Sequence, residues 1–299
     1  MVDAATSFKR APAGFASEQW REFQNRGLLI IENAYSAREI EAWQEAVLRL
    51  QSTRADSFFT LQNFVETDPA FASLIDHPAH VGLVYDLYGE MLKLQLSELF
   101  VRAPGGNARP ERWHIDGPRV LPYAAFAPGA PMQVKVGVWL TDVLQHSMGN
   151  LAFVPGSHRH QYFDAYDTDE TVGDEEQLVV RRGALTLMDT ALWHRTVPND
   201  SGTTRINLYL GYSPSWLPTS DRNTSDPVWL ASLNREQRII MRSYEKAFSH
   251  AKPPAEDFPL FLGRHSGTDR EPDRYRDHVR LFHRKRTTAR ERFQTASSR

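Results

Sequence analysis

Five short stretches between Leu92 and Tyr212 decide the fold class. They read LKLQLSELFV (92–101), QVKVGVWLTD (133–142), GNLAFVP (149–155), LVVRRGALTLM (178–188) and RINLYLGY (205–212). Apolar residues recur at every second position in these stretches, as they do in strands that bury one face. Gly, Pro, Asn and Asp separate them. Many short strands joined by turns predict a β-sandwich or barrel and argue against a parallel α/β sheet.

The residues on either side of this region predict helices. Before it, Ser36 and Glu39 form a capping box ahead of an apolar stripe at helical spacing. A second helix is expected over Pro78 to Gly89. After it, Asp226-Pro227 marks the start of a helix that should run to about Phe248.

The chain shows no internal repeat and no low-complexity linker. We therefore expect a single domain over residues 1–299. Its β core should cover about 92–215, preceded by a helical segment at 1–91 and followed by a helical extension at 216–299. Its 299 residues are enough to bury a large core without disulfides.

Charge and cysteine content exclude several classes of protein. The chain has 35 Lys+Arg and 37 Asp+Glu, so its near-neutral charge provides no general attraction for nucleic acid or an anionic membrane. It has no cysteine, which excludes disulfides, Cys-ligated zinc, iron–sulfur clusters and a thiol nucleophile. Any metal must be held by His, Asp or Glu.

The first residues, MVDAATSFKRAPAGF, lack the apolar segment of a secretory signal. Apolar runs such as Leu28 to Ile31 are far shorter than a membrane span. These features predict a cytoplasmic protein. We separately expect it to act on a small molecule, as a monomer or a homodimer.

The sequence Trp-His-Ile-Asp at 113–116 places His114 and Asp116 two residues apart. On a strand, such residues point to the same face. One imidazole and one carboxylate could therefore bind the same ion. This pattern alone is weak, because H-x-D often occurs by chance and a histidine at a strand end is usually just packed.

A second histidine, His194, lies before a turn-rich segment at 198–202. This arrangement predicts a β-hairpin. With the turn centred between Asn199 and Asp200, His194 lies opposite Arg205, and Thr196 lies opposite Thr203 on the same face. The register is inferred, and a shift of one residue stays open.

Two histidines and one carboxylate on one face of an octahedral ion leave three positions open, as in non-haem Fe(II) oxygenases. An α-keto acid can fill two of these positions and O₂ the third. The far carboxylate of a dicarboxylic keto acid needs a fixed cation, and Arg205 offers a planar two-point donor. Thr196 could add a hydroxyl to the same carboxylate.

The run GNLAFVPGSHR (149–159), with WHID before it and WHRTVPNDSGTTR (193–205) after it, resembles the phytanoyl-CoA hydroxylase (phytanoyl-CoA dioxygenase) family of Fe(II)/2-oxoglutarate-dependent oxygenases. The stretch GLLIIENAYSAREIEAWQEAV (27–47) is similar to the opening of that family. The resemblance implies a mainly β fold with flanking helices, namely a double-stranded β-helix (jelly-roll, cupin-like) core.

The resemblance also implies roles for individual residues. His114, Asp116 and His194 match the metal ligands, which are also the catalytic residues, and Arg205 matches the 2-oxoglutarate arginine. Thr196 matches a hydroxyl residue at the same carboxylate, and Trp139 matches a position that lines the keto-acid pocket. The implied cofactors are Fe(II) and 2-oxoglutarate, used as a cosubstrate.

The leading hypothesis is a dioxygenase that hydroxylates an unactivated C–H bond of an acyl, amino-acid or secondary-metabolite substrate, releasing succinate and CO₂. Desaturation, cyclisation and epoxidation stay open. Two alternatives are a metal-dependent hydrolase, which leaves Arg205 unexplained, and a non-catalytic jelly-roll binding module. The proline-rich segment Gly117 to Pro131 follows the ligand pair directly, which predicts a lid or a substrate wall.

Overall fold

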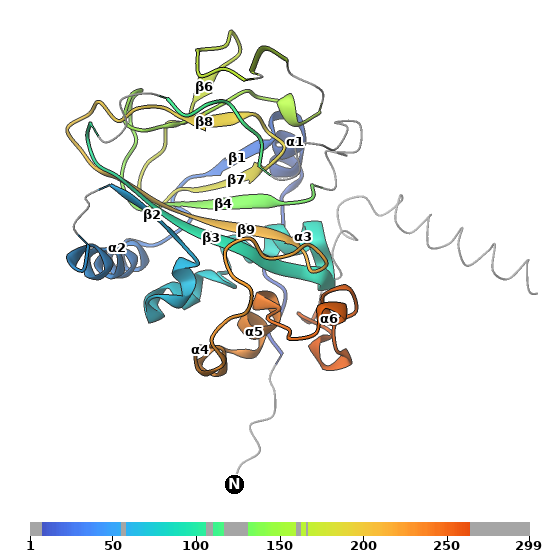
Figure 1. Ribbon diagram of the computed structural model, residues 1–299. Helices are drawn as coiled ribbons and strands as arrows, with labels where there is room; N and C mark the ends of the chain where they lie inside the picture. The colour runs from blue at the N-terminus through green and yellow to red at the C-terminus, as the bar shows by residue number, and fades with distance from the viewer. Residues whose placement is uncertain are drawn as a thin grey trace, which may run out of the picture.

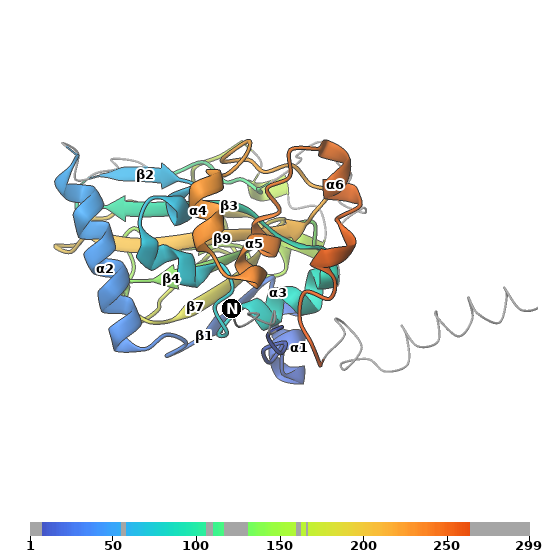
Figure 2. The same ribbon diagram turned by 90° about the horizontal axis from the view of Figure 1, so that it is seen from below.

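The computed structural model describes residues 8–54, 58–105, 110–116, 131–159, 163–165 and 167–263. Two antiparallel sheets face each other, and helices cover the outer face of the larger one (Figures 1 and 2). The predicted mainly β architecture with flanking helices is thereby confirmed. The segment Gly117 to Pro131 falls outside the described residues except for its last residue, and so does the chain after Gly263.

The larger sheet has the strand order β1-β7-β4-β9-β3-β2. The bounds of its strands are β1 Leu28–Ile31, β2 Phe59–Gln62, β3 Leu92–Arg102, β4 Val134–Trp139, β7 Leu185–Asp189 and β9 Arg205–Pro214. The smaller sheet has the order β6-β5-β8, with β5 Leu151–Phe153, β6 Glu176–Gln177 and β8 His194–Thr196.

The α-helices are α1 Ser17–Arg26, α2 Ala37–Ser52, α3 Val81–Tyr88, α4 Pro227–Ser232, α5 Arg235–Met241 and α6 Ala247–Ala251. Seen from below, α2, α4, α5 and α3 lie across the larger sheet (Figure 2). The smaller sheet lies on the opposite face (Figure 1). None of the helices in the described ranges is both long and apolar enough to cross a membrane.

The alternation along β4 shows how the sequence builds the two layers. Val134, Val136 and Val138 belong to the apolar core under the helices. The residues between them take the other face, because successive side chains of a strand point in opposite directions. That face carries Lys135, which is buried, and Trp139, which packs in a second core beneath the smaller sheet. Both faces of the strand are therefore covered, and polar side chains on the inner face border an enclosed site.

The capping box that begins α2 is present as predicted. Ser36 Oγ accepts from the backbone nitrogen of Glu39 at 3.3 Å, and the Glu39 carboxylate accepts from that of Ser36 at 2.8 Å. The expected helix at Pro78 to Gly89 begins only at Val81.

The single helix expected from Asp226 to about Phe248 is wrong. Asp226 does cap a helix, but α4 ends at Ser232. Asn234 then caps α5 in a new capping box with Gln237, and Arg242 ends α5 in the left-handed region, with φ of 47°. The side chain of an Asn offers the backbone an alternative to continuing a helix, which explains the break.

The predicted hairpin between His194 and Arg205 is also wrong. Strand β8 pairs with β5 in the smaller sheet, where His194 lies opposite Phe153 and Thr196 opposite Leu151. Strand β9 pairs with β3 and β4 in the larger sheet. The turn-rich segment therefore crosses from one layer to the other. His194 and Arg205 border the interior of the sandwich from opposite sheets.

Candidate metal centre

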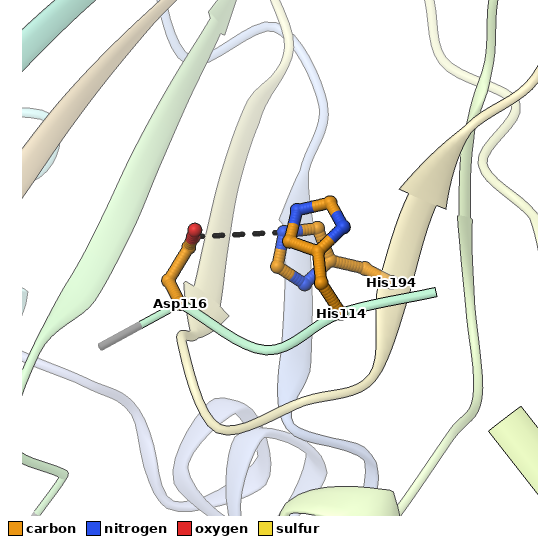
Figure 3. A group of neighbouring side chains, drawn as sticks. All are labelled: His114, Asp116 and His194. Carbon is orange, nitrogen blue, oxygen red and sulfur yellow. Dashed lines mark ion pairs between the residues drawn. The ribbon is translucent and has the colours of Figure 1, made fainter. Parts of the chain in front are cut away.

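Three side chains of the metal-ligand type come together at the edge of the smaller sheet (Figure 3). His194 is the first residue of β8, and the segment that carries His114 and Asp116 runs antiparallel beside it. His114 N donates to His194 O at 3.0 Å and His194 N donates to His114 O at 2.9 Å. Asp116 N donates to Thr190 O at 2.8 Å. Main-chain hydrogen bonds thus fix the backbone positions of all three residues.

The side-chain atoms are close enough to share one ion. One nitrogen or oxygen from each of the three residues lies within 4.8 Å of the others. His194 Nε2 is 3.5 Å from Asp116 Oδ2. Ligand atoms about 2.1 Å from one ion are about 3 Å apart when adjacent and about 4 Å apart when opposite. The group therefore needs only a small contraction to enclose a metal.

Both histidines are oriented by the same local contact. His114 Nδ1 lies 2.9 Å from the carbonyl oxygen of Arg112, and His194 Nδ1 lies 2.8 Å from that of Leu192. Because a carbonyl only accepts, each Nδ1 carries the proton and donates. Each Nε2 is then left with a free lone pair, which is what a metal ligand requires.

Electrostatics favour the protonation states that bind a cation. Burial lowers the pKa of His194 to about 4, so the ring is neutral at pH 7. Burial opposes ionisation of Asp116, but the nearby Lys135 ammonium outweighs it and holds the pKa of the carboxyl well below its usual range. A neutral His194 imidazole and an ionised Asp116 carboxylate suit a divalent transition metal.

Lys135 and Glu98 are charged neighbours that the sequence did not reveal. Lys135 Nζ lies 2.9 Å from Asp116 Oδ2 and 3.1 Å from Glu98 Oε2, and all three side chains are at least three-quarters buried. In the alternating sequence QVKVGVW, the pattern predicts that Lys135 lies on the exposed face of a strand. Only the second layer shows that this face of β4 is enclosed.

Arg205 is a buried cation that forms no ion pair with any described residue. It is 3% exposed, and its Nη1 donates to the carbonyl of Gly149. Its Nε finds no hydrogen-bond partner in the described part of the chain, and no carboxylate there forms an ion pair with it. Burial lowers the pKa of Arg205 to about 10, which still leaves it protonated at pH 7. A buried charge of this kind calls for an anionic ligand.

Asn207 extends the same surface. It lies two residues after Arg205 on β9 and pairs with Trp139 of β4. Its side chain is completely buried, and neither amide atom has a hydrogen-bond partner among the described residues. An unsatisfied buried amide is costly, so it indicates a polar group that the polypeptide itself does not supply. The sequence analysis did not single out this residue.

Trp139 is held in a fixed orientation on the inner face. Its Nε1 donates to Thr186 Oγ1 at 3.1 Å, and its ring lies 5.9 Å from the Arg205 guanidinium carbon. Gly137 makes room for this bond, because a Cβ there would lie 2.3 Å from Thr186 Oγ1. Thr196 shares a strand face with His194 and is half-buried. It pairs with Leu151 of β5, and the predicted pairing with Thr203 is wrong.

Comparison with known proteins identifies a family and a curated relative of this chain. The family described as phytanoyl-CoA dioxygenase (PhyH) matches residues 23–207. A curated protein of Stutzerimonas stutzeri, named a probable alpha-ketoglutarate-dependent hypophosphite dioxygenase, is 25% identical over 233 residues, which cover 66% of this chain and 78% of that protein.

Solved structures show the same fold. HygX from Streptomyces hygroscopicus, with nickel and 2-oxoglutarate bound, superposes with a TM-score of 0.58 at 21% identity, covering 71% of this chain and 93% of that one. SnoK, a non-heme alpha ketoglutarate dependent carbocyclase from nogalamycin biosynthesis, gives 0.55 at 20% identity, covering 68% and 87%. The predicted jelly-roll core is confirmed. Since the family match spans more than half of the residues of this chain, the chain belongs to the phytanoyl-CoA dioxygenase family.

Proposed function

We propose that this protein is an Fe(II)- and 2-oxoglutarate-dependent dioxygenase whose metal ligands are His114, Asp116 and His194. The observation that carries the proposal is the convergence of one ligand atom from each of these three residues within 4.8 Å, together with a buried arginine that forms no ion pair among the described residues. Membership of the phytanoyl-CoA dioxygenase family supports the reaction class.

The three residues would hold the ion through two imidazole nitrogens and one carboxylate oxygen, a donor set that suits Fe(II). Iron bound there supplies the redox chemistry by which 2-oxoglutarate and O₂ are converted to succinate and CO₂ while one oxygen atom becomes available to the substrate. The carbonyls of Arg112 and Leu192 orient the two imidazoles, burial keeps His194 neutral, and the Lys135 ammonium keeps Asp116 ionised.

Arg205 is the residue proposed to bind the distal carboxylate of 2-oxoglutarate. Its guanidinium can donate two parallel hydrogen bonds to a carboxylate, and burial strengthens such a contact. Asn207 would donate from its amide on the same strand face. Trp139 would form an apolar wall of this pocket, and Thr196 would contribute its hydroxyl from the opposite sheet.

For the reaction outcome we propose hydroxylation of an unactivated C–H bond in a small acyl, amino-acid or secondary-metabolite substrate. Asp116 supports oxygen transfer over halogenation, because its carboxylate fills the position that a halide would otherwise take. The proteins of similar fold include a carbocyclase and an epimerase. The relative named for hypophosphite makes an inorganic anion a candidate to include among test substrates. A hydrolase with the same ligands would leave Arg205 without a role.

The test is a screen for succinate. The purified protein is supplied with Fe(II), 2-oxoglutarate and O₂, and succinate is measured against a panel of acyl, amino-acid, polycyclic and phosphorus-oxyanion compounds. Succinate should form only with iron, should rise with a true substrate, and should be absent for His194→Ala. Succinate formation that needs no iron, or that survives loss of His194, would overturn the proposal.

A further inference from the structure

Lys135 joins the two layers of the sandwich at the proposed metal centre. It belongs to β4 of the larger sheet, whereas Asp116 lies beside β8 of the smaller one. Its ammonium contacts Asp116 Oδ2 at 2.9 Å and Glu98 Oε2 at 3.1 Å. The Lys135 side chain is 11% exposed and the Glu98 side chain 15%. The ammonium therefore lies between two carboxylates, one of which is a proposed metal ligand.

Strand β9 separates Lys135 from Glu98 in the sheet. Glu98 of β3 pairs with Tyr209 of β9, and Lys135 of β4 pairs with Gly211. The Tyr209 ring is 5.7 Å from Lys135 Nζ. The lysine and the glutamate thus meet across the intervening strand.

Stability alone does not account for this group. A buried ion pair is on average no more stabilising than apolar side chains of the same volume, because desolvation offsets the attraction. Lys135, Glu98 and Asp116 together carry a net charge of −1. Because these side chains are buried, the low effective dielectric constant strengthens the interactions among their charges. A dication raises this net charge to +1. With Arg205 added, the centre then carries a charge of +2, which a dianionic keto acid neutralises.

We propose that Lys135, held by Glu98, is a positioning residue that acts through Asp116 to set the charge of the metal centre, so that the centre binds a dication and still admits a dianionic keto acid. This inference rests on the proposed function. It assigns roles to two residues that are neither metal ligands nor the 2-oxoglutarate arginine.

The test compares two affinities in four variants, all anaerobically. Fe(II) affinity is measured by competition with a chromogenic chelator, and 2-oxoglutarate affinity is measured by titrating the iron-loaded protein. Lys135→Met makes the centre more negative, so Fe(II) should bind at least as tightly as in the wild type, and 2-oxoglutarate should bind at least 10-fold more weakly. Glu98→Gln should have the opposite effect, with weaker iron and undiminished keto acid.

The double variant Lys135→Met/Glu98→Gln restores the net charge of −1, so both affinities should return to within about three-fold of the wild type. Lys135→Arg keeps the charge and serves as the matched control. A purely structural role predicts that both affinities fall together with the thermal midpoint, and this result would overturn the inference, as would unchanged affinities. If Lys135→Met fails to fold, Glu98→Gln and Lys135→Arg still decide the matter. Failure of the wild type to bind iron and 2-oxoglutarate would instead reject the proposed function.

Discussion

His114 and His194 form a hydrogen-bonded antiparallel pair, with each residue's backbone N–H donating to the other's carbonyl at 3.0 and 2.9 Å. Their ring centroids lie 4.4 Å apart. The residues beside them, Trp113 and Arg195, also contact each other, with the Arg195 guanidinium 4.7 Å from the Trp113 ring. Two strands that are far apart in sequence are thus joined on both of their faces. The spacing of the proposed ligands is set by this double contact.

Glu175 should stabilise this arrangement through Arg195. The two side chains form an ion pair at 2.7 Å, and both are almost fully buried. Glu175→Gln should lower the free energy of unfolding by about 2–4 kcal/mol, because it leaves a buried guanidinium without its anion. It should also weaken Fe(II) binding about 10-fold through the displaced ligand strand.

Denaturant unfolding and iron titration measure these two effects. Glu176→Gln is the matched control, since Glu176 is the next residue and its ion pair with Arg26 is half exposed. That change should alter stability by less than about 0.5 kcal/mol. Equal behaviour of the two variants would contradict a role for the buried pair.

Arg205→Ala should separate cosubstrate binding from metal binding. The loss of a buried charge-assisted contact should cost about 2–4 kcal/mol in 2-oxoglutarate affinity. Iron affinity should change little, because Arg205 is not among the proposed ligands. Arg112→Ala, in which the lost side chain is two-thirds exposed, serves as the control. Normal 2-oxoglutarate affinity in Arg205→Ala would remove the assignment.

Asn207 should affect the free and the bound protein differently. Asn207→Leu removes a buried amide that has no partner in the described structure, so the ligand-free protein should be at least as stable as the wild type. The same change should weaken 2-oxoglutarate binding several-fold. Asn207→Asp should weaken it further, because a negative charge would face the distal carboxylate. Thermal unfolding with and without 2-oxoglutarate measures both effects, and undiminished stabilisation by the ligand in either variant would argue against contact.

Asp189 makes stability depend on pH away from the metal centre. Burial raises the pKa of its carboxyl to about 7, whereas in the unfolded chain it titrates near its ordinary value of 3.8. The folded state therefore holds the proton more tightly, and the stability contributed by Asp189 is full below about pH 4 and lost as the pH rises through 7.

Asp189→Asn keeps an oxygen that can accept from the Ala191 N–H and carries no charge. The variant should be more stable than the wild type by about 2–4 kcal/mol at pH 8, and should match it near pH 4. Urea unfolding at both pH values tests this prediction. A variant that is destabilised equally at both would show that the carboxyl is ionised and well solvated in the fold.

The local patterns of the sequence were reliable guides to single elements. Alternation predicted the strands, and the Ser36–Glu39 pair predicted where α2 begins. The i, i+2 spacing of His114 and Asp116 predicted that their side chains lie close together. These features depend on neighbours within a few residues, so the sequence contains their causes.

The error in strand pairing arose where two layers meet. A turn-rich segment predicts a hairpin equally well when it crosses between sheets, so the pairing of His194 with Arg205 could not be distinguished from the observed pairing with Phe153. Lys135 and Asn207 are polar residues on alternating strands, which normally indicate a solvated face. Their burial depends on the second sheet, whose placement is set by contacts far apart in the sequence.

The central claim is that His114, Asp116 and His194 bind iron and that Arg205 binds 2-oxoglutarate beside it. Anaerobic addition of Fe(II) and then 2-oxoglutarate, followed by visible absorption, tests this claim most directly. The wild type should develop a weak metal-to-ligand charge-transfer band that saturates with one equivalent of iron. Asp116→Ala and His194→Ala should remain folded and show no band. The absence of a band in the wild type, or its full retention in either variant, would contradict the account.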